Sequence, residues 1–495
     1  MISVSALPLL AYKVGPNLFD LSSNLHQVSM RDQLHRAVAL AEALVAGNQF
    51  RLGHQVLIVG AGVAGIVAGM VLAKHGIEVQ IIDSSMSAPF DLQRGVDTRF
   101  IGPYMYEWPL SVYACQKMPP PPAAVLFPWS DGMSTTLPFK DSAPARPSDV
   151  VDSWEPILEQ AIANSNGLLR LQVGIDRDST NLQVKRWLHT ERYIAEKRRP
   201  RKKTRRVTIY GGSPWRVSRE PYGPLVPRFV LLAAGMGSET NTIRDDKSNI
   251  LLKGDRFWAN DKIGEPSCGL PSPPRIVVIG GGDGAMQDAL RAATIDANPL
   301  KTWDRLRAAD ANNLLPKALA DIQVMETQHA LTTIWTEVHS IHSHELSILD
   351  SAYQSLAKEL AQDEHLANAA LASMRTDVQQ VCLCIKESHF SKAYALNRFL
   401  VHILEQCRLA AHGVHGGAAL NVIRKVTVKG VGELGAAKEL TLSNGDRLTA
   451  EIVIVRFGAD HSELPGQWLG LTAKDTMNRQ ELAKVPLPLY LPPSN

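Results

Sequence analysis

Short apolar runs, each followed by glycines or an acidic residue, recur along this chain of 495 residues. The first run, 55–59, precedes a glycine loop, a stretch of small apolar residues and a second apolar run, 77–82. The same order begins again at 275–279. Apolar runs without alternation are typical of strands that are buried on both faces of a parallel sheet. The pattern therefore predicts an α/β fold with two parallel-sheet domains.

The first glycine loop has the spacing of a dinucleotide-binding turn. Gly60 allows a tight turn after the strand, Gly62 lets the backbone approach a pyrophosphate, and Gly65 allows close packing of the next helix. The N-terminus of that helix offers free N–H groups to a phosphate. Asp83, 18 residues after Gly65, can accept hydrogen bonds from an adenosine ribose. The candidate site also includes Ala61, Ala64 and Ser84.

A second loop lies about 220 residues further along and ends in alanine instead of the last glycine. Asp283 is unexpected in this loop, because a carboxylate beside a phosphate should repel it. Two such loops in one chain indicate that electrons pass between two dinucleotides. The candidate residues of the second site are Gly280, Gly281, Gly282, Asp283, Gly284 and Ala285.

Residues 278–289 resemble the nicotinamide-binding loop of thioredoxin reductases, which tolerates an aspartate at this place. The pair of loops resembles the wider superfamily of flavoproteins with two Rossmann-type dinucleotide-binding domains. This resemblance implies FAD at the first loop and NADH or NADPH at the second. It also implies a strand that ends in glycine near the close of each nucleotide domain, which 229–235 and 451–458 supply. Gly235 and Gly458 are therefore candidate cofactor-binding residues.

Two departures from that superfamily limit what the resemblance implies. Thioredoxin reductases have a C-x-x-C pair before the second loop, whereas this chain has only Cys268 there. Cys382 and Cys384 are separated by a single residue, which is not a usual dithiol motif. A second flavin-binding segment with Gly-Asp is also missing after Gly458. Thiol–disulfide chemistry is not indicated.

The nucleotide preference of the second site depends on the strand that follows its helix. An insertion over 296–328 and then a strand over 331–335 are expected, and the strand end places Glu337 near the ribose. Glu337 favours NADH, because a carboxylate repels the 2′-phosphate of NADPH. The nearby histidines are of a residue type that binds metal ions, but no carboxylate or cysteine completes a ligand set, so no metal is expected. They are His339, His342 and His344.

The spacing of apolar residues predicts helices outside the two nucleotide domains. One helix should follow a cap at Ser29, and a helical insertion over 345–411 is a candidate contact for a homo-oligomer. A hairpin is expected around the turn 443–446. The expected domains are an N-terminal helical extension (1–50), an FAD-binding domain (51–272), an NAD(P)-binding domain (273–465) and a tail (466–495).

Two further segments allow more than one interpretation. The aromatic stretch 99–109 either returns towards the flavin or forms a surface loop anchored by its rings. The basic block 197–206 is either an exposed insertion, which is the more frequent case, or a contact for nucleic acid.

Composition narrows the remaining classes. Apolar residues make up 45% and charged residues 20% of the chain, as in ordinary globular proteins, and the net charge of +3 does not imply a polyanionic partner. Five cysteines without a repeating framework indicate a reducing compartment. A signal peptide and a membrane span are not expected, so the predicted location is the cytoplasm.

The leading hypothesis is an FAD-dependent oxidoreductase that uses NADH or NADPH to reduce its flavin, which then acts on a small-molecule substrate or on oxygen. No side chain is identified as a catalytic acid or base. The alternatives are a nucleotide-binding sensor or scaffold that has lost turnover, and a flavoprotein that acts on RNA.

Overall fold

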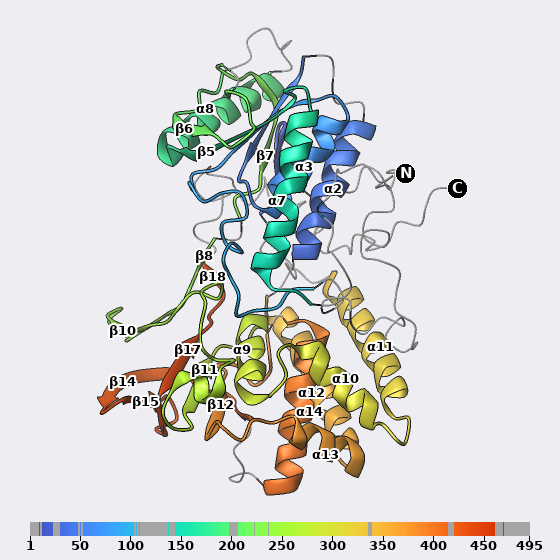
Figure 1. Ribbon diagram of the computed structural model, residues 1–495, viewed down its shortest axis with the longest axis vertical. Helices are drawn as coiled ribbons and strands as arrows, with labels where there is room; N and C mark the ends of the chain where they lie inside the picture. Colours follow the sequence, from blue (N-terminus) through green and yellow to red (C-terminus); the bar gives the residue numbers. More distant parts are fainter. Residues whose placement is uncertain are drawn as a thin grey trace. The chain divides into compact units, whose positions relative to one another are not determined.

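The computed structural model describes most of the chain in two compact units. The described residues are 12–22, 30–47, 53–102, 144–197, 206–334 and 339–413 without 222, 236 and 392, then 420–460, and a few single residues elsewhere. Unit 1 is formed by residues 1–95, 120–238 and 460–495, and unit 2 by residues 96–119 and 239–459. Figure 1 shows the elements of both units.

The sheet of unit 1 has seven strands in the order β1-β2-β7-β3-β4-β5-β6. β3 pairs in parallel with β4 on one side and with β7 on the other, and the apolar runs at 55–59 and 77–82 form β3 and β4 as expected. The strands are β1 (Lys13–Gly15), β2 (Leu18–Asp20), β3 (Gln55–Val59), β4 (Glu78–Ile82), β5 (Leu169–Ile175), β6 (Gly211–Pro214) and β7 (Pro227–Leu232).

The order β5-β4-β3-β7 places the first glycine loop between strands whose connections run to opposite sides. Dinucleotides bind at such a switch point, beyond the carboxyl ends of the strands. The helices of this unit are α2 (Met30–Ala46), α3 (Val63–Lys74), α7 (Pro147–Asn164) and α8 (Arg177–Glu196). α3 is buried from its first residue to Ala73, because small side chains let it lie close to the sheet and to α2. The N-terminal segment contributes β1 and β2 to the sheet as well as the expected helix.

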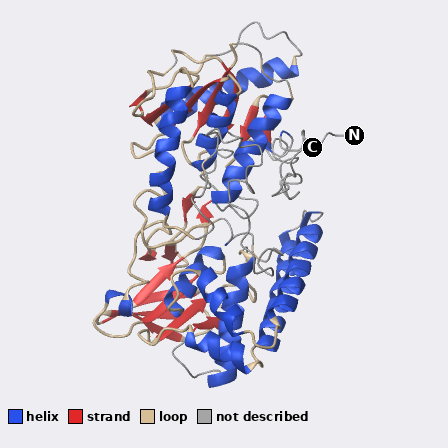
Figure 2. Ribbon diagram, turned by 45° about the vertical axis from the view of Figure 1, so that its right-hand side comes forward, coloured by secondary structure: helices blue, strands red, loops and turns tan. Residues whose placement is uncertain are grey.

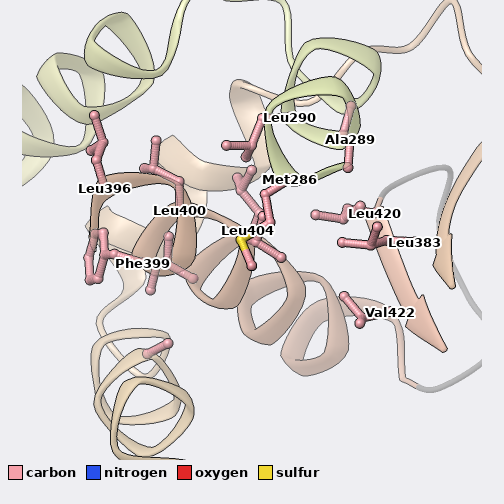
Figure 3. Close-up of a cluster of buried hydrophobic side chains, with 14 of the residues drawn as sticks. Met286, Ala289, Leu290, Leu383, Leu396, Phe399, Leu400, Leu404, Leu420 and Val422 are labelled. Carbon is pink, nitrogen blue, oxygen red and sulfur yellow. The ribbon is translucent and has the colours of Figure 1, made fainter. Parts of the chain in front are cut away.

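The main sheet of unit 2 repeats this order with the strands β13-β12-β11-β17, all parallel. Its strands are β11 (Arg275–Ile279), β12 (Gln380–Cys384), β13 (Leu420–Ile423) and β17 (Ile452–Val455). α9 (Asp283–Ala293) follows the second glycine loop, and α14 (Ala395–His412) connects β12 to β13. Figure 3 shows leucines of α14 meeting Met286 and Leu290 of α9 and Leu383 of β12 in the core.

A helical insertion separates α9 from β12. It contains α10 (Pro299–Ala309), α11 (Leu315–Ile334), α12 (His339–Leu360) and α13 (Glu364–Ala372), which Figure 2 shows among the helices of unit 2. The strand expected over 331–335 is wrong, since residues up to Ile334 belong to α11. The first half of α11 buries Leu315, Leu319 and Ile322, and the place beside β11 is taken by β12. Glu337 lies outside the described residues.

An antiparallel sheet of β14 (Val428–Leu434), β15 (Ala437–Leu442) and β16 (Arg447–Ala450) packs on the other face of the unit 2 sheet. The expected hairpin is confirmed: β15 and β16 pair antiparallel around Gly445, whose φ is +89°. The remaining elements are β8 (Ser238–Glu239), β9 (Thr242–Arg244), β10 (Ile250–Lys253), the 3-10 helix η2 (Pro266–Gly269) and β18 (Ala459–Asp460).

The aromatic segment after β4 belongs to unit 2. Trp108 is 2% exposed, and its ring centroid lies 5.3 Å from those of Trp303 and Phe399 in the core of that unit. Trp108 is therefore a core residue of unit 2, and most of the other residues of the aromatic stretch 99–109 after Gly102 lie outside the described residues.

Candidate cofactor sites

The two glycine loops have matching backbone geometry. Gly60 has a φ of +111° and Gly280 a φ of +145°. A Cβ at Gly60 would overlap the carbonyl of Ala233, and a Cβ at Gly280 would overlap the carbonyl of Arg456. Ala233 and Arg456 each come directly after the neighbouring strand, β7 or β17. Glycine is thus required at both turns by conformation and by the close approach of a strand.

Gly62 provides the fit for a pyrophosphate in unit 1. No heavy atom of the described residues lies within 4 Å of the position that a Cβ at Gly62 would take, whereas a Cβ at Gly65 would overlap the carbonyl of Gly60. Gly62 is also the N-cap of α3, and no side chain caps this end. The first N–H groups of α3 are therefore left for an anion beside open space. Ala61 and Ala64 are buried, so their side chains belong to the interior of unit 1.

Asp83 closes the first loop from the end of β4. Its Oδ2 accepts from the backbone N–H of Ala61 at 2.7 Å, and its Oδ1 accepts from that of Ser85 at 2.8 Å. Burial raises the pKa of Asp83, and these backbone hydrogen bonds act in the opposite direction. Each carboxylate oxygen keeps a second lone pair, so Asp83 can still accept from a ribose hydroxyl. Ser84 is exposed beside it.

Asp283 is occupied by hydrogen bonds from α9 and from the start of α14, which gives this unexpected carboxylate a structural role. Its carboxylate accepts from the backbone N–H of Tyr394 at 3.0 Å and from the side-chain amides of Asn397 and Gln287, each at 2.8 Å. Burial raises the pKa of Asp283, while the bonds from Asn397 and Tyr394 lower it. The side chain therefore joins the N-terminal turns of α9 and α14. Ala285, in place of the third glycine, is buried.

The residue that corresponds to Asp83 in unit 2 is Ile385. β3 and β4 pair Val59 with Ile82, and β11 and β12 pair Ile279 with Cys384, so Asp83 and Ile385 each follow the paired strand end. Ile385 is fully buried and cannot accept a hydrogen bond from a ribose. The exposed residues Lys386 and Glu387 follow it. Reasoning from the sequence missed this position because the insertion separates β12 from α9.

A buried group of charges lies on α9, after the second loop, and no pattern in the sequence indicated it. Asp288 of α9 is fully buried and accepts from Arg99 at 2.7 Å, from Arg291 at 3.0 Å and from Arg456 at 2.8 Å. Burial raises the pKa of Asp288, but the three guanidinium groups outweigh it and the net shift is downward. These contacts fix Arg99, which follows β4 in the chain, and Arg456, directly after β17, to α9 by charge.

Gly235 and Gly458 occupy equivalent places in the two units. Each is the third residue after its strand, β7 or β17, and the φ values are +83° and +89°. Both are exposed, and no heavy atom lies within 4 Å of the position of a Cβ at either residue. Both positions therefore leave open space at the carboxyl edge of their sheets, which is where a dinucleotide is expected.

The described cysteines are free and buried. Burial raises the pKa of Cys382 to about 11 and that of Cys384 to about 12, so both thiols are protonated at neutral pH. Within the described ranges, no group of His, Cys, Asp and Glu side chains is suited to hold a metal ion. None of the described helices is long and apolar enough to cross a membrane.

Comparison with known proteins supports FAD in unit 1. The family model of the FAD binding domain matches residues 53–97, which include β3, the first glycine loop, α3, β4 and Asp83. No curated protein matches the chain in sequence. The matched range places an FAD-binding sequence at the first glycine loop, within an α/β fold whose two main sheets share the same strand order around their glycine loops.

Several solved structures resemble the chain at low identity. Bacillithiol disulfide reductase Bdr (YpdA) from Bacillus cereus is 10% identical, with a TM-score of 0.36 over 83% of this chain and 79% of that chain. The Staphylococcus aureus protein of the same name is 10% identical, with a TM-score of 0.33 over 82% and 76%. The HOCl-induced flavoprotein disulfide reductase RclA from Escherichia coli is 10% identical, with a TM-score of 0.33 over 82% and 56%. At these TM-scores the likeness adds nothing to the argument from the two sheets.

Proposed function

We propose that this protein is an FAD-dependent oxidoreductase in which unit 1 binds FAD and unit 2 binds a reduced nicotinamide dinucleotide. The observation that supports this function is the duplicated arrangement, in which a glycine loop follows the central strand β3 or β11 of each sheet. One of the two arrangements matches the FAD binding domain model. A bound flavin would accept hydride from the nicotinamide and pass electrons to a small-molecule substrate or to oxygen.

The residues of unit 1 would bind and orient the flavin nucleotide. The N–H groups at the start of α3 would hold its pyrophosphate in the open space at Gly62, and Asp83 would accept from its ribose. The described cysteines provide no redox pair, because their thiols are buried and no disulfide joins them. Disulfide reduction by a dithiol of the described residues is therefore not part of the proposal.

The preferred nucleotide of unit 2 is proposed to be NADPH. The expectation of NADH was based on Glu337 at the end of a strand, and the residues before it form α11 instead. At the end of β12, Ile385 supplies no acceptor for a 2′-hydroxyl, and Lys386 forms no ion pair with any described residue. An unpaired lysine at this point favours the 2′-phosphate of NADPH.

Anaerobic reduction of the flavin tests this function. Purified protein should be yellow and release FAD on denaturation, and excess NADPH without oxygen should bleach the oxidised flavin absorbance. Dithionite serves as the control, because it reduces flavin without the second site. Colourless protein without extractable FAD would refute the flavin site. Bleaching by dithionite alone would favour the nucleotide-binding sensor over the oxidoreductase.

A further inference from the structure

The helical insertion is tied to the core of unit 2 by a buried ion pair. Arg398 of α14 is 1% exposed, and its Nη1 donates to Oδ1 of Asp350 on α12 at 2.6 Å. α12 and α14 pack against each other in this unit (Figure 1). A buried ion pair is costly to desolvate and is a poor source of stability compared with apolar packing. Its presence here therefore calls for a role other than stability.

The same guanidinium reaches the segment that covers the second glycine loop. Nη2 of Arg398 donates to the carbonyl of Ser391 at 2.7 Å. The backbone N–H of Ser391 donates to the carbonyl of Gly281 at 2.8 Å. Arg398 thus links Asp350 of the insertion to the glycine loop through one peptide segment.

Asp350 has a second partner that fixes its orientation. Its Oδ1 lies 3.0 Å from Nε2 of His402, whose ring centroid lies 5.1 Å from that of Phe390. Burial raises the pKa of Asp350, but the hydrogen bonds and charges of His402 and Arg398 outweigh this effect. The net shift of the pKa is downward, so the carboxylate stays ionised at neutral pH. Asp350 of α12 is therefore bound by two residues of α14, Arg398 and His402, which lie one helical turn apart.

Asp283 holds the same turn from the other side. It accepts from the N–H of Tyr394 and from Asn397, so the first turn of α14 is attached to α9 as well as to α12. Ser391 lies three residues before Tyr394, the N-cap of α14. Its position against Gly281 is therefore fixed by contacts at both ends of a short segment.

We propose that Arg398 is a positioning residue: clamped by Asp350, it holds Ser391 against the second glycine loop, so that the insertion sets the nucleotide affinity of unit 2. The affinity part of this proposal rests on the proposed function. Arg398 acts through the backbone of Ser391 and does not itself need to touch the nucleotide. The insertion thereby gains a role that the apolar pattern of its helices did not indicate.

Two variants of the full-length flavoprotein test the proposal. Asp350→Asn removes the charge that orients Arg398. Arg398→Lys keeps a positive charge beside Asp350 but loses the planar fork whose two nitrogens donate separately to Asp350 and Ser391. The control is Asp296→Asn, which breaks the ion pair between Asp296 and Arg305 at 2.8 Å in the insertion, away from the loop. Hydrogen exchange of the amides in 388–394 and 280–284 is measured on the protein alone, and the Kd for NADPH is measured by titration.

Both test variants should speed exchange of the Ser391 amide by about tenfold or more, since it loses its fixed partner. The Kd for NADPH should rise by about tenfold, the loss expected for one charge-assisted hydrogen bond. FAD content should not change, and Asp296→Asn should alter neither quantity.

Unchanged exchange at 388–394 in both test variants would overturn the proposal, as would an equal rise in Asp296→Asn. Raised exchange with an unchanged Kd for NADPH would overturn the link to affinity. If wild-type protein binds neither NADPH nor NADH, the proposed function fails and the link to affinity fails with it, while exchange still decides whether Arg398 positions the loop. Should Asp350→Asn not fold, Arg398→Lys carries the test, because it preserves the buried charge pair.

Discussion

Unit 1 and unit 2 share a backbone arrangement and differ in how each holds its glycine loop. In unit 1, Asp83 at the end of β4 bonds directly to the N–H of Ala61 in the loop. In unit 2 the corresponding residue is the apolar Ile385, and the contacts come from the segment before α14: Ser391 donates to Gly281, and Tyr394 donates to Asp283. The glycines fix the turn in both units, whereas the contacts that hold each loop come from different elements.

The helices that follow the two loops show the same contrast. α3 is apolar and buried along its length, so packing alone holds it against the sheet. α9 instead contains Asp288, which requires three arginines around it because an unpaired buried carboxylate is very costly. Unit 2 thus depends on charges from distant segments where unit 1 depends on local packing.

The largest effect is expected from Gly62→Val, which tests whether unit 1 alone holds the flavin. Its Cβ would enter open space, so the protein should fold, but the side chain would fill the pyrophosphate position. Loss of one charge-assisted hydrogen bond costs about 1.5–3 kcal/mol, and steric overlap adds to this. We expect colourless, folded protein, as judged by flavin absorbance and circular dichroism. Retention of FAD would show that the flavin lies elsewhere.

Gly282→Val is the matching change in unit 2 and should have a somewhat smaller effect. Gly282 has a φ of −98° and a ψ of −178°, which valine can adopt. The variant should stay yellow and be reduced by dithionite, while bleaching by NADPH is lost. If Gly282→Val lost FAD and Gly62→Val kept it, the assignment of the two sites would be reversed.

Lys386→Glu tests whether the residues after β12 set the preference of unit 2 for NADPH over NADH. The change reverses the charge at the residue after Ile385, so the Kd for NADPH should rise by about tenfold, or roughly 1.4 kcal/mol, and that for NADH should change little. Lys429→Glu, on β14 and half exposed, is the control for charge reversal in the same unit. Equal changes for NADPH and NADH would place the preference at another residue, with Glu337 the first to test.

The smallest effect is expected at the starts of the central strands. Gln55 begins β3 and donates to Glu78 at 2.9 Å, whereas Arg275 at the start of β11 is paired with Glu451 at 2.5 Å. The hydrogen bond from Arg275 lowers the pKa of Glu451 to about 2, from an ordinary value of 4.5. The folded pKa lies below the unfolded one, so the pair stabilises unit 2 above pH 4.5 and this is lost as the pH falls towards about 2.

Glu451→Gln should therefore lower the free energy of unfolding at pH 7 by at most about 1 kcal/mol, because both side chains are partly exposed and screened by solvent. Denaturant unfolding at pH 7 and near pH 2.5 measures the difference, which should shrink at the lower pH. A difference that grows on acidification would contradict the sign.

The central strands of the two sheets and the glycine turns after them could be predicted from the sequence alone. Tight turns after buried strands can be recognised in the local sequence, because only glycine adopts a φ such as that of Gly280 without strain. The apolar runs at 55–59 and 275–279 were assigned correctly for the same reason, since burial on both faces requires continuous apolar residues.

The tertiary structure decided which strand stands beside β11 and which distant side chains reach the second loop. The apolar run 331–335 had the length of a strand, but residues up to Ile334 belong to α11. The partners of Asp283, Asp288 and Arg398 lie on elements far away in the sequence. Charge pairing between such elements depends on how they pack in space, so the pairs cannot be predicted from the local spacing of apolar residues.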